Sequence, residues 1–107
     1  MNIIINEMEG TEKQNAYAAD IIRREFGCDL SDKFVTMKLM SDFCMLNELK
    51  GMRVSPKLYR PFYRELTAEK LAAMADEYTR TATCREVIDN KGANVARAAM
   101  AILLANA

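Results

Sequence analysis

The sequence predicts an all-α or mainly α protein, a compact bundle of four to five short helices with an extended N-terminal arm. Apolar residues recur every three to four positions through most of the chain, which is the period of an amphipathic helix. The four glycines, at positions 10, 27, 51 and 92, each stand at the boundary of such a segment. One short stretch, residues 2–6, is typical of a β-strand, but the chain offers it no second strand.

Length and composition favour one domain that acts in a reducing cytosol. A chain of 107 residues, half of them apolar, is expected to form a single helical domain over residues 1–107. No apolar run approaches the ~20 residues that cross a bilayer. The first ten residues lack the basic start and the long apolar stretch of a signal peptide. We therefore expect a cytoplasmic protein that makes no membrane contact.

The N-terminal stretch has two alternative arrangements. It lies as an extended arm on the helices, or its edge pairs with another molecule. In the second case Ile3, Ile4 and Ile5, or the alanine-rich C-terminal helix, would mediate self-association. A molecular mass that rises with concentration would reveal it.

The first helix is predicted over residues 11–26. Thr11 caps it, and Gln14 three residues later completes a capping box, because each side chain can bond to the other residue's backbone N–H. Gly27 ends the run. The apolar face of this helix holds Tyr17, Ala18, Ile21, Ile22 and Phe26.

The second helix is predicted from a cap at Ser31 to about Lys50, with Gly51 ending it. Its apolar residues cover much more than one stripe. A helix of this kind is usually central in a bundle or shared with a partner.

Residues 52–66 are expected to be irregular. Pro56 and Pro61 should break any long helix, which leaves short turns around residues 57–59 and 62–66.

The C-terminal part is predicted to hold a third helix, a short turn and a last helix. Thr67 caps the third helix, and the threonine-rich residues 79–83 interrupt or bend it. Thr83 and Glu86 resemble a second capping box, which starts a short turn. Residues 90–92 form a turn before the last helix, predicted over residues 93–105.

The chain has no recognisable catalytic, metal or cofactor site. It contains no histidine, which removes the usual general base and the commonest metal ligand. No glycine-rich phosphate loop is present. Cys28, Cys44 and Cys84 are odd in number and widely spaced, so we expect buried reduced thiols and no disulfide framework or zinc site. We therefore predict a protein that is not an enzyme.

Positive charge is concentrated in the middle of a chain whose net charge is zero. Residues 33–64 carry seven bases and two acids, and residues 53–64 hold four bases and three aromatic residues with no acid. Arginine and tyrosine are enriched at binding hot spots. The candidate binding residues are Arg53, Lys57, Tyr59, Arg60, Phe62, Tyr63 and Arg64.

Three interpretations of this basic and aromatic segment remain open. Leu58, Phe62 and Leu66 could fill the core while the bases are simply solvated. The segment could contact a protein. Its bases could also follow a nucleic-acid backbone while its aromatic rings stack on bases.

Two pieces of the sequence resemble small accessory proteins of phages, plasmids and conjugative elements of Firmicutes. Residues 10–23, GTEKQNAYAADIIR, are similar to a Gly-Ser/Thr-Glu-Lys-Gln helix start with an aromatic-Ala-x-x-Ile-Arg continuation. Residues 87–91, VIDNK, are similar to a C-terminal Trp-Ile-Asp-Asn-Arg motif. Tyr17, Val87 and Lys91 stand where tryptophan, tryptophan and arginine are usual.

The resemblance implies a mobile-element accessory protein of a bacterial host cytosol and assigns no catalytic residue. Small proteins of such elements include inhibitors of host defence, among them anti-CRISPR proteins. Our first hypothesis is therefore a protein-binding inhibitor or adaptor that blocks a host protein, or a protein–nucleic acid complex, by steric occlusion. The alternative is a small nucleic-acid-binding factor that uses the same segment, 53–64. Of these two, only the nucleic-acid-binding factor should bind its partner with an affinity that falls steeply as the salt concentration rises.

Overall fold

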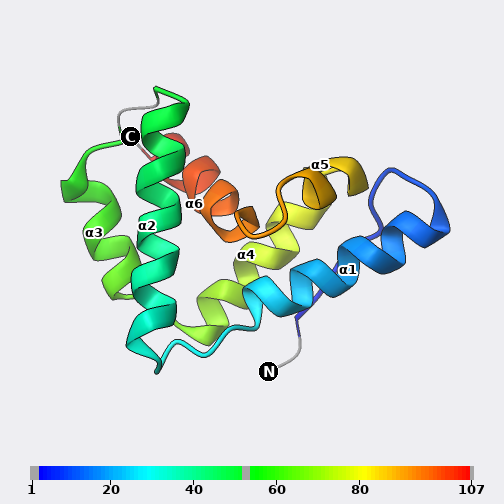
Figure 1. Ribbon diagram of the computed structural model, residues 1–107, viewed down its shortest axis with the longest axis horizontal. Helices are drawn as coiled ribbons and strands as arrows, with labels where there is room; N and C mark the ends of the chain where they lie inside the picture. The colour runs from blue at the N-terminus through cyan, green and yellow to red at the C-terminus, as the bar shows by residue number, and fades with distance from the viewer. Residues whose placement is uncertain (1–2, 52–53, 107) are drawn as a thin grey trace.

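Six helices run through the part of the chain that this computed structural model describes, residues 3–51 and 54–106 (Figure 1). They confirm the all-α prediction. The number exceeds the predicted four to five, because two segments expected to be turns are helical. In chain order the helices are α1 (Glu12–Phe26), α2 (Lys33–Leu49), α3 (Pro56–Arg64), α4 (Ala68–Thr81), α5 (Cys84–Asp89) and α6 (Asn94–Ala105).

Helix α6 lies in the middle of the molecule and packs against α1, α2 and α4 (Figure 1). Helix α1 packs in addition on α4 and α5. Helix α3 lies along the outer side of α2, where the rings of Tyr59 and Tyr63 contact the ring of Phe43. No helix in the described ranges is long and apolar enough to cross a membrane.

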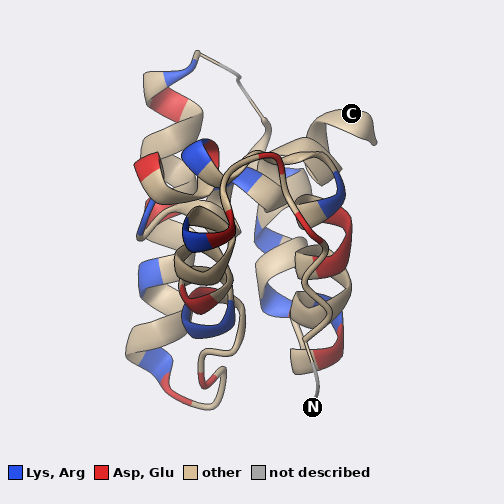
Figure 2. Ribbon diagram, turned by 90° about the vertical axis from the view of Figure 1, so that its right-hand side faces the viewer, with Lys and Arg blue, Asp and Glu red and all other residues tan. Residues whose placement is uncertain are grey.

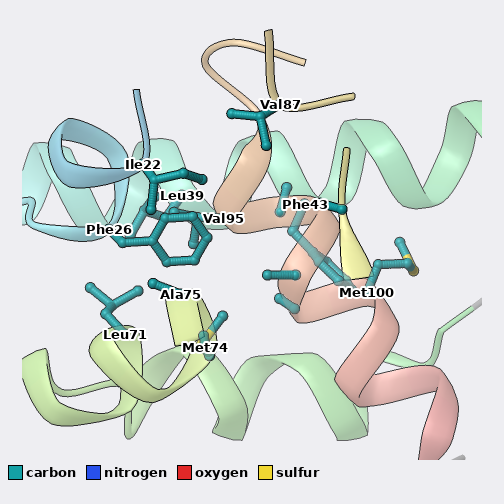
Figure 3. Close-up of a cluster of buried hydrophobic side chains, with 14 of the residues drawn as sticks. Ile22, Phe26, Leu39, Phe43, Leu71, Met74, Ala75, Val87, Val95 and Met100 are labelled. Atoms are coloured by element: carbon teal, nitrogen blue, oxygen red, sulfur yellow. The ribbon is translucent and has the colours of Figure 1, made fainter. Parts of the chain in front are cut away.

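The core lies where these helices meet (Figure 3). Phe26 of α1 and Phe43 of α2 are its largest buried side chains. Burying a side chain of this size contributes about 1.5–3 kcal/mol relative to leaving it exposed. The core also holds Ile22, Leu39, Leu71, Met74, Ala75, Val87, Val95 and Met100.

The predicted start of α1 is confirmed by two reciprocal hydrogen bonds. The Thr11 hydroxyl accepts from the Gln14 N–H at 3.1 Å, and the Thr11 N–H donates to the Gln14 side-chain oxygen at 2.9 Å. These bonds satisfy donors that the first turn of a helix otherwise leaves without a partner. The helix ends at Phe26, and Gly27 is its C-cap, as predicted.

Helix α2 begins one residue later than predicted. Its N-cap is Asp32, whose carboxylate accepts from the Phe34 N–H at 2.9 Å. The Ser31 hydroxyl, the expected cap, donates instead to the Asp29 carboxylate at 2.6 Å. At the other end Gly51 has a φ of +61°, a left-handed conformation that glycine adopts without strain.

The expectation of two short turns at residues 57–59 and 62–66 was wrong, because α3 is one continuous helix of nine residues. Pro56 stands at its first position, where a helix needs no backbone donor. Pro61 lies inside the helix and removes one donor. The packing of two tyrosines on Phe43, with ring centroids 5.2 and 5.5 Å apart, offsets that loss.

The threonine-rich segment separates two helices. The predicted cap of α4 is confirmed, since the Thr67 hydroxyl accepts from the Lys70 N–H at 3.1 Å, and α4 ends at Thr81. Thr83 caps α5 by accepting from the Glu86 N–H, also at 3.1 Å. The return half of the predicted capping box is not formed, because the Glu86 side chain lines a pocket between helices instead.

The N-terminal arm lies extended against the helices and is not paired as a strand. Ile3 and Ile5 pack on the core, whereas Ile4 remains 60% exposed. The Asn15 side chain of α1 holds the arm, because its amide accepts from the Met8 N–H at 2.8 Å and donates to the Met8 carbonyl at 2.9 Å.

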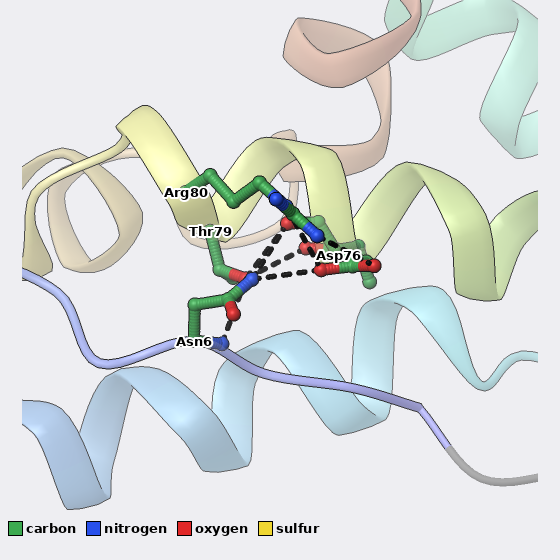
Figure 4. A network of polar contacts seen from close by, with 5 residues as sticks. Asn6, Asp76, Thr79 and Arg80 are labelled. Atoms are coloured by element: carbon green, nitrogen blue, oxygen red, sulfur yellow. Dashed lines mark hydrogen bonds and ion pairs between the residues drawn. The ribbon is translucent and has the colours of Figure 1, made fainter.

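Asn6 joins the arm to α4 (Figure 4). Its side-chain amide donates to the Asp76 carboxylate at 2.9 Å, and its backbone N–H donates to the Thr79 hydroxyl at 3.0 Å. The bonds from Asn6 and Arg80 lower the pKa of Asp76. The charged carboxylate therefore stabilises the fold above its ordinary pKa, and this contribution is lost as the pH falls through the lowered pKa.

The start of α6 is capped by a side chain from another helix. Its N-cap, Ala93, has no side-chain hydrogen bond to offer. The Glu25 carboxylate of α1 accepts instead from the backbone N–H groups of Gly92 and Asn94, both at 2.9 Å. A carboxylate at this end also interacts favourably with the helix dipole.

Asn94 itself is fully buried and bonds to three other helices. Its amide group donates to the Val87 carbonyl of α5 at 3.0 Å and to the Glu25 carboxylate at 3.2 Å. Its amide oxygen accepts from the Tyr78 hydroxyl of α4 at 2.7 Å. Buried polar groups of this kind are costly to leave without partners.

We predict that Asn94→Ala lowers the free energy of unfolding by about 2–4 kcal/mol, because it leaves the buried Val87 carbonyl and the part-buried Tyr78 hydroxyl without the bonds that they make to Asn94. Urea denaturation followed by circular dichroism measures the change. Asn106→Ala is the matched control, since that exposed asparagine bonds only within its own helix. Equal stability of the two variants would contradict the role assigned to Asn94.

Gly10 is required by both backbone and space. Its φ is +149°, and an added Cβ would lie 2.8 Å from the Cys84 sulfur. We predict that Gly10→Ala costs about 2–4 kcal/mol, from a strained backbone and an overpacked contact together. Gly92→Ala, with a φ of +92° but open space around it, should cost only about 1–2 kcal/mol. Thermal unfolding compares the two, and an equal loss would show that the contact with Cys84 is unimportant.

Candidate functional site

Helix α2 presents large apolar side chains to solvent. Phe34 is 81% exposed, Met37 66%, Met45 59% and Leu49 78%. Their spacing of three, eight and four residues places them on one side of the helix. The opposite side buries Leu39 and Phe43. Half of the exposed large apolar residues in the described chain belong to this one helix, which is typical of an interaction surface.

Helix α3 divides the predicted basic and aromatic segment into two faces. Tyr63 is buried, and Tyr59 and Phe62 are partly buried against the core. Lys57, Arg60 and Arg64 are exposed, and their spacing of three and four residues places them in one row. Phe62 and Leu66 pack against the core, as the first of the three interpretations expected, but Leu58 is 38% exposed, so that interpretation was wrong for Leu58. The two tyrosines also pack inward, and the bases face solvent. Arg53, the remaining candidate, lies outside the described residues.

A groove of about 650 Å³ lies between α2 and α3. Methionines from α2 and arginines from α3 face each other across it. Methionine side chains adapt to different partners because they are flexible and polarisable. The lining residues are Thr36, Met37, Met40, Ser41, Cys44, Arg60, Tyr63 and Arg64.

The bases of α3 have no acidic partner within the described part of the chain. The ion pairs found there join Arg23 to Asp20, Lys38 to Asp42, Arg80 to Asp76 and Arg85 to Asp89. Each of these four ion pairs joins two residues of the same helix. The α3 row therefore presents an uncompensated positive charge beside an apolar groove.

The Tyr63 hydroxyl is a buried polar group with no hydrogen-bond partner in the described structure. Tyr63 lines the groove and is 6% exposed. Burial raises the pKa of Tyr63 well above its ordinary value, and the nearby Asp42 carboxylate adds to the shift. The hydroxyl thus stays neutral and keeps its proton available to an acceptor.

The three cysteines differ in burial. Cys84 is fully buried under the N-terminal arm, with its sulfur 3.9 Å from the Met8 carbonyl oxygen, while Cys28 and Cys44 are half-buried. All three thiols are free. Burial raises the pKa of Cys28 and of Cys84, which disfavours their thiolates. No cluster of three acidic or thiol side chains suited to a metal ion occurs among the described residues.

The two pieces that resemble mobile-element proteins lie side by side in the fold. Helix α1 packs against α5, and the Lys91 ammonium lies 5.8 Å from the centre of the Tyr17 ring. A cation in this position is attracted by the face of the ring. These residues hold two helices together and do not line the groove.

The surfaces considered for self-association are mostly used within the chain. Helix α6 buries most of its apolar side chains, and Leu104, at 39%, is its most exposed large one. On the arm, Ile4 is the exposed isoleucine. In the view from the side of α1 and α5, acidic and basic positions are interspersed along the helices (Figure 2).

Sequence reasoning anticipated that the second helix could extend the contact surface, but not which of its residues line the groove. The breadth of its apolar pattern indicated a helix that is central or shared with a partner, and α2 is central on one side and exposed on the other. The contacts of Asn6, Asn15 and Asn94 correspond to no recognisable sequence pattern. Each joins residues far apart in the chain or needs a defined local geometry.

Comparison with protein-family models, with curated proteins and with solved structures finds no match to this chain.

We predict that Cys28 and Cys44 react with a thiol reagent in the folded protein, whereas Cys84 reacts only after denaturation, because its side chain is fully buried. Mass spectrometry after labelling with iodoacetamide counts the modified thiols. Cys44→Ser should lower the native count by one. Equal reactivity of all three thiols would contradict the packing of the arm over α5.

Proposed function

We propose that this protein is a non-enzymatic, protein-binding inhibitor or adaptor, and that its interface is the groove between α2 and α3. The observation that carries the proposal is the meeting of an exposed apolar helix face with a row of unpaired bases. Apolar contacts supply affinity in such an interface, and arginines at its edge supply further binding energy and specificity.

The chemistry of the groove indicates the kind of partner. Met37 and Met40 accept an apolar side chain, and Arg60 and Arg64 can each bind a carboxylate through two parallel hydrogen bonds. A partner surface with apolar residues flanked by aspartate or glutamate fits both features. A helix of the partner, with one apolar stripe, would lie along such a groove.

The inward packing of the aromatic rings favours a protein partner over nucleic acid. Base stacking needs exposed rings, but Tyr59, Phe62 and Tyr63 pack against the core. The row of Lys57, Arg60 and Arg64 is the specific feature that keeps nucleic-acid binding as the second candidate. It would then supply phosphate contacts without reading bases.

The biological setting is proposed from the resemblance of residues 10–23 and 87–91 to accessory proteins of phages and mobile elements. An accessory protein with a binding surface and no recognisable chemistry is suited to block a host defence protein by steric occlusion, as an anti-CRISPR protein would.

Paired variants test the site. We expect Arg60→Ala combined with Arg64→Ala, and separately Met37→Ser, to weaken partner binding at least about tenfold, because each removes a contact of hot-spot size. Arg23→Ala combined with Arg85→Ala, on α1 and α5, is the control that also removes two exposed bases. Pull-down from a bacterial lysate identifies the partner, and calorimetry with the purified partner measures affinity. Full binding by the first two variants would show that the interface lies elsewhere.

Salt dependence distinguishes the two candidate functions. If three bases contact phosphates of a DNA duplex, affinity falls by about 40-fold between roughly 50 and 200 mM salt. A protein interface dominated by apolar contacts loses much less. Fluorescence anisotropy with labelled DNA and RNA at the two salt concentrations measures this directly, and tight, salt-sensitive binding would replace the first proposal with the second.

A further inference from the structure

A second cavity, of about 360 Å³, lies where α2, α4, α5 and α6 meet. It shares no lining residue with the α2–α3 groove. Most of its wall is apolar and includes Leu46 of α2 together with Met100 and Leu104 of α6. Its volume falls within the range of small-molecule sites, which are mostly apolar with a few placed polar groups.

Arg97 brings a charged group into this apolar cavity. Its side chain is partly buried, and its Nε is buried without a hydrogen-bond partner among the described residues. None of the ion pairs found in the described chain includes Arg97. A buried N–H without an acceptor is costly, so an acceptor that binds at Arg97 stabilises the structure.

The other polar groups of the cavity give it a net positive charge. Lys50, at the end of α2, is a second cation, and Glu86 of α5 is the one acid that lines the cavity. The Tyr78 hydroxyl lines the cavity and donates to Asn94. Its oxygen can still accept an N–H bond from Arg97, but a neutral hydroxyl does not balance the charge of the guanidinium. With two cations and one acid, the cavity lining carries one net positive charge, which one anion would balance.

We propose that this cavity binds a small amphiphile with one anionic head group, a carboxylate or a phosphate monoester, and an aliphatic body. The head group accepts hydrogen bonds from Arg97, and Lys50 adds attraction at the mouth. The aliphatic body lies against Leu46, Met100 and Leu104. Glu86 opposes the anion and lowers its affinity.

Octanoate and octyl phosphate are the probes, with octanol as the uncharged control. We expect saturable binding of at least one anion, with amide shifts in heteronuclear NMR spectra confined to the cavity. Octanol should bind at least about tenfold more weakly, because it cannot form charge-assisted hydrogen bonds. Which anion binds more tightly identifies the head group. Absence of saturable binding by both anions, or equal binding of octanol, would overturn the proposal.

Three variants test the residues, and a fourth is the control. Arg97→Met keeps the aliphatic length but should lower anion affinity at least about tenfold, while Glu86→Gln should raise it severalfold. Ala101→Phe fills the cavity from an exposed position and should abolish binding with Arg97 still present. Arg80→Met removes a cation outside the cavity and should leave the affinity for the anion unchanged.

Unchanged affinity in Arg97→Met, or in Ala101→Phe, would overturn the assignment. If Arg97→Met fails to fold, Glu86→Gln and Ala101→Phe decide the question alone. The inference is independent of the protein-binding groove, because Arg60→Ala with Arg64→Ala leaves every residue of this cavity in place.

Discussion

The contact between Glu25 and the start of α6 is the interaction on which the rest of the structure depends. Helix α6 has no side-chain cap of its own, and the Glu25 carboxylate of α1 satisfies its first donors. Asn94 extends this contact to α4 and α5. Helix α2 packs on α6, and α3 packs on α2 through Phe43. The cavity is lined by α6 itself, and the groove depends on α6 through the packing of α2 on it. Both therefore depend on a helix whose first turn is capped by a residue of another helix.

Much of the fold could be predicted from the sequence because the helix signals are local. The caps at Thr11, Thr67 and Thr83 depend on residues three positions away, and all three form the hydrogen bond expected of them. The errors arose where two local signals competed. Ser31 and Asp32 are both good caps, and Pro61 opposes a helix that the packing of its tyrosines favours. Tertiary contacts decided the second case, and they are not visible in a short window.

The candidate site could be predicted only in part. The basic character of residues 53–64 follows from composition alone, and the structure shows it in the exposed row of Lys57, Arg60 and Arg64 on α3. Which of its residues face inward depends on the helical period, and the interpretation as irregular turns concealed that period. The groove also needs α2 as a neighbour, and no pattern in the sequence specifies that neighbour. Arg97 illustrates the same limit, because its lack of a partner appears only when four helices surround it.

The asparagine that holds the N-terminal arm has a consequence for how the chain behaves among its own copies. The arm is the one β-prone segment of the sequence, and such segments recruit neighbouring chains through free backbone groups. The Asn15 amide has the same donor and acceptor as a peptide group, and it occupies both backbone groups of Met8. Asn6 and Glu9 each use one more backbone group within the chain. Side chains thus occupy backbone groups at the end of the β-prone stretch and just beyond it, which shortens the edge that a neighbouring chain could pair with.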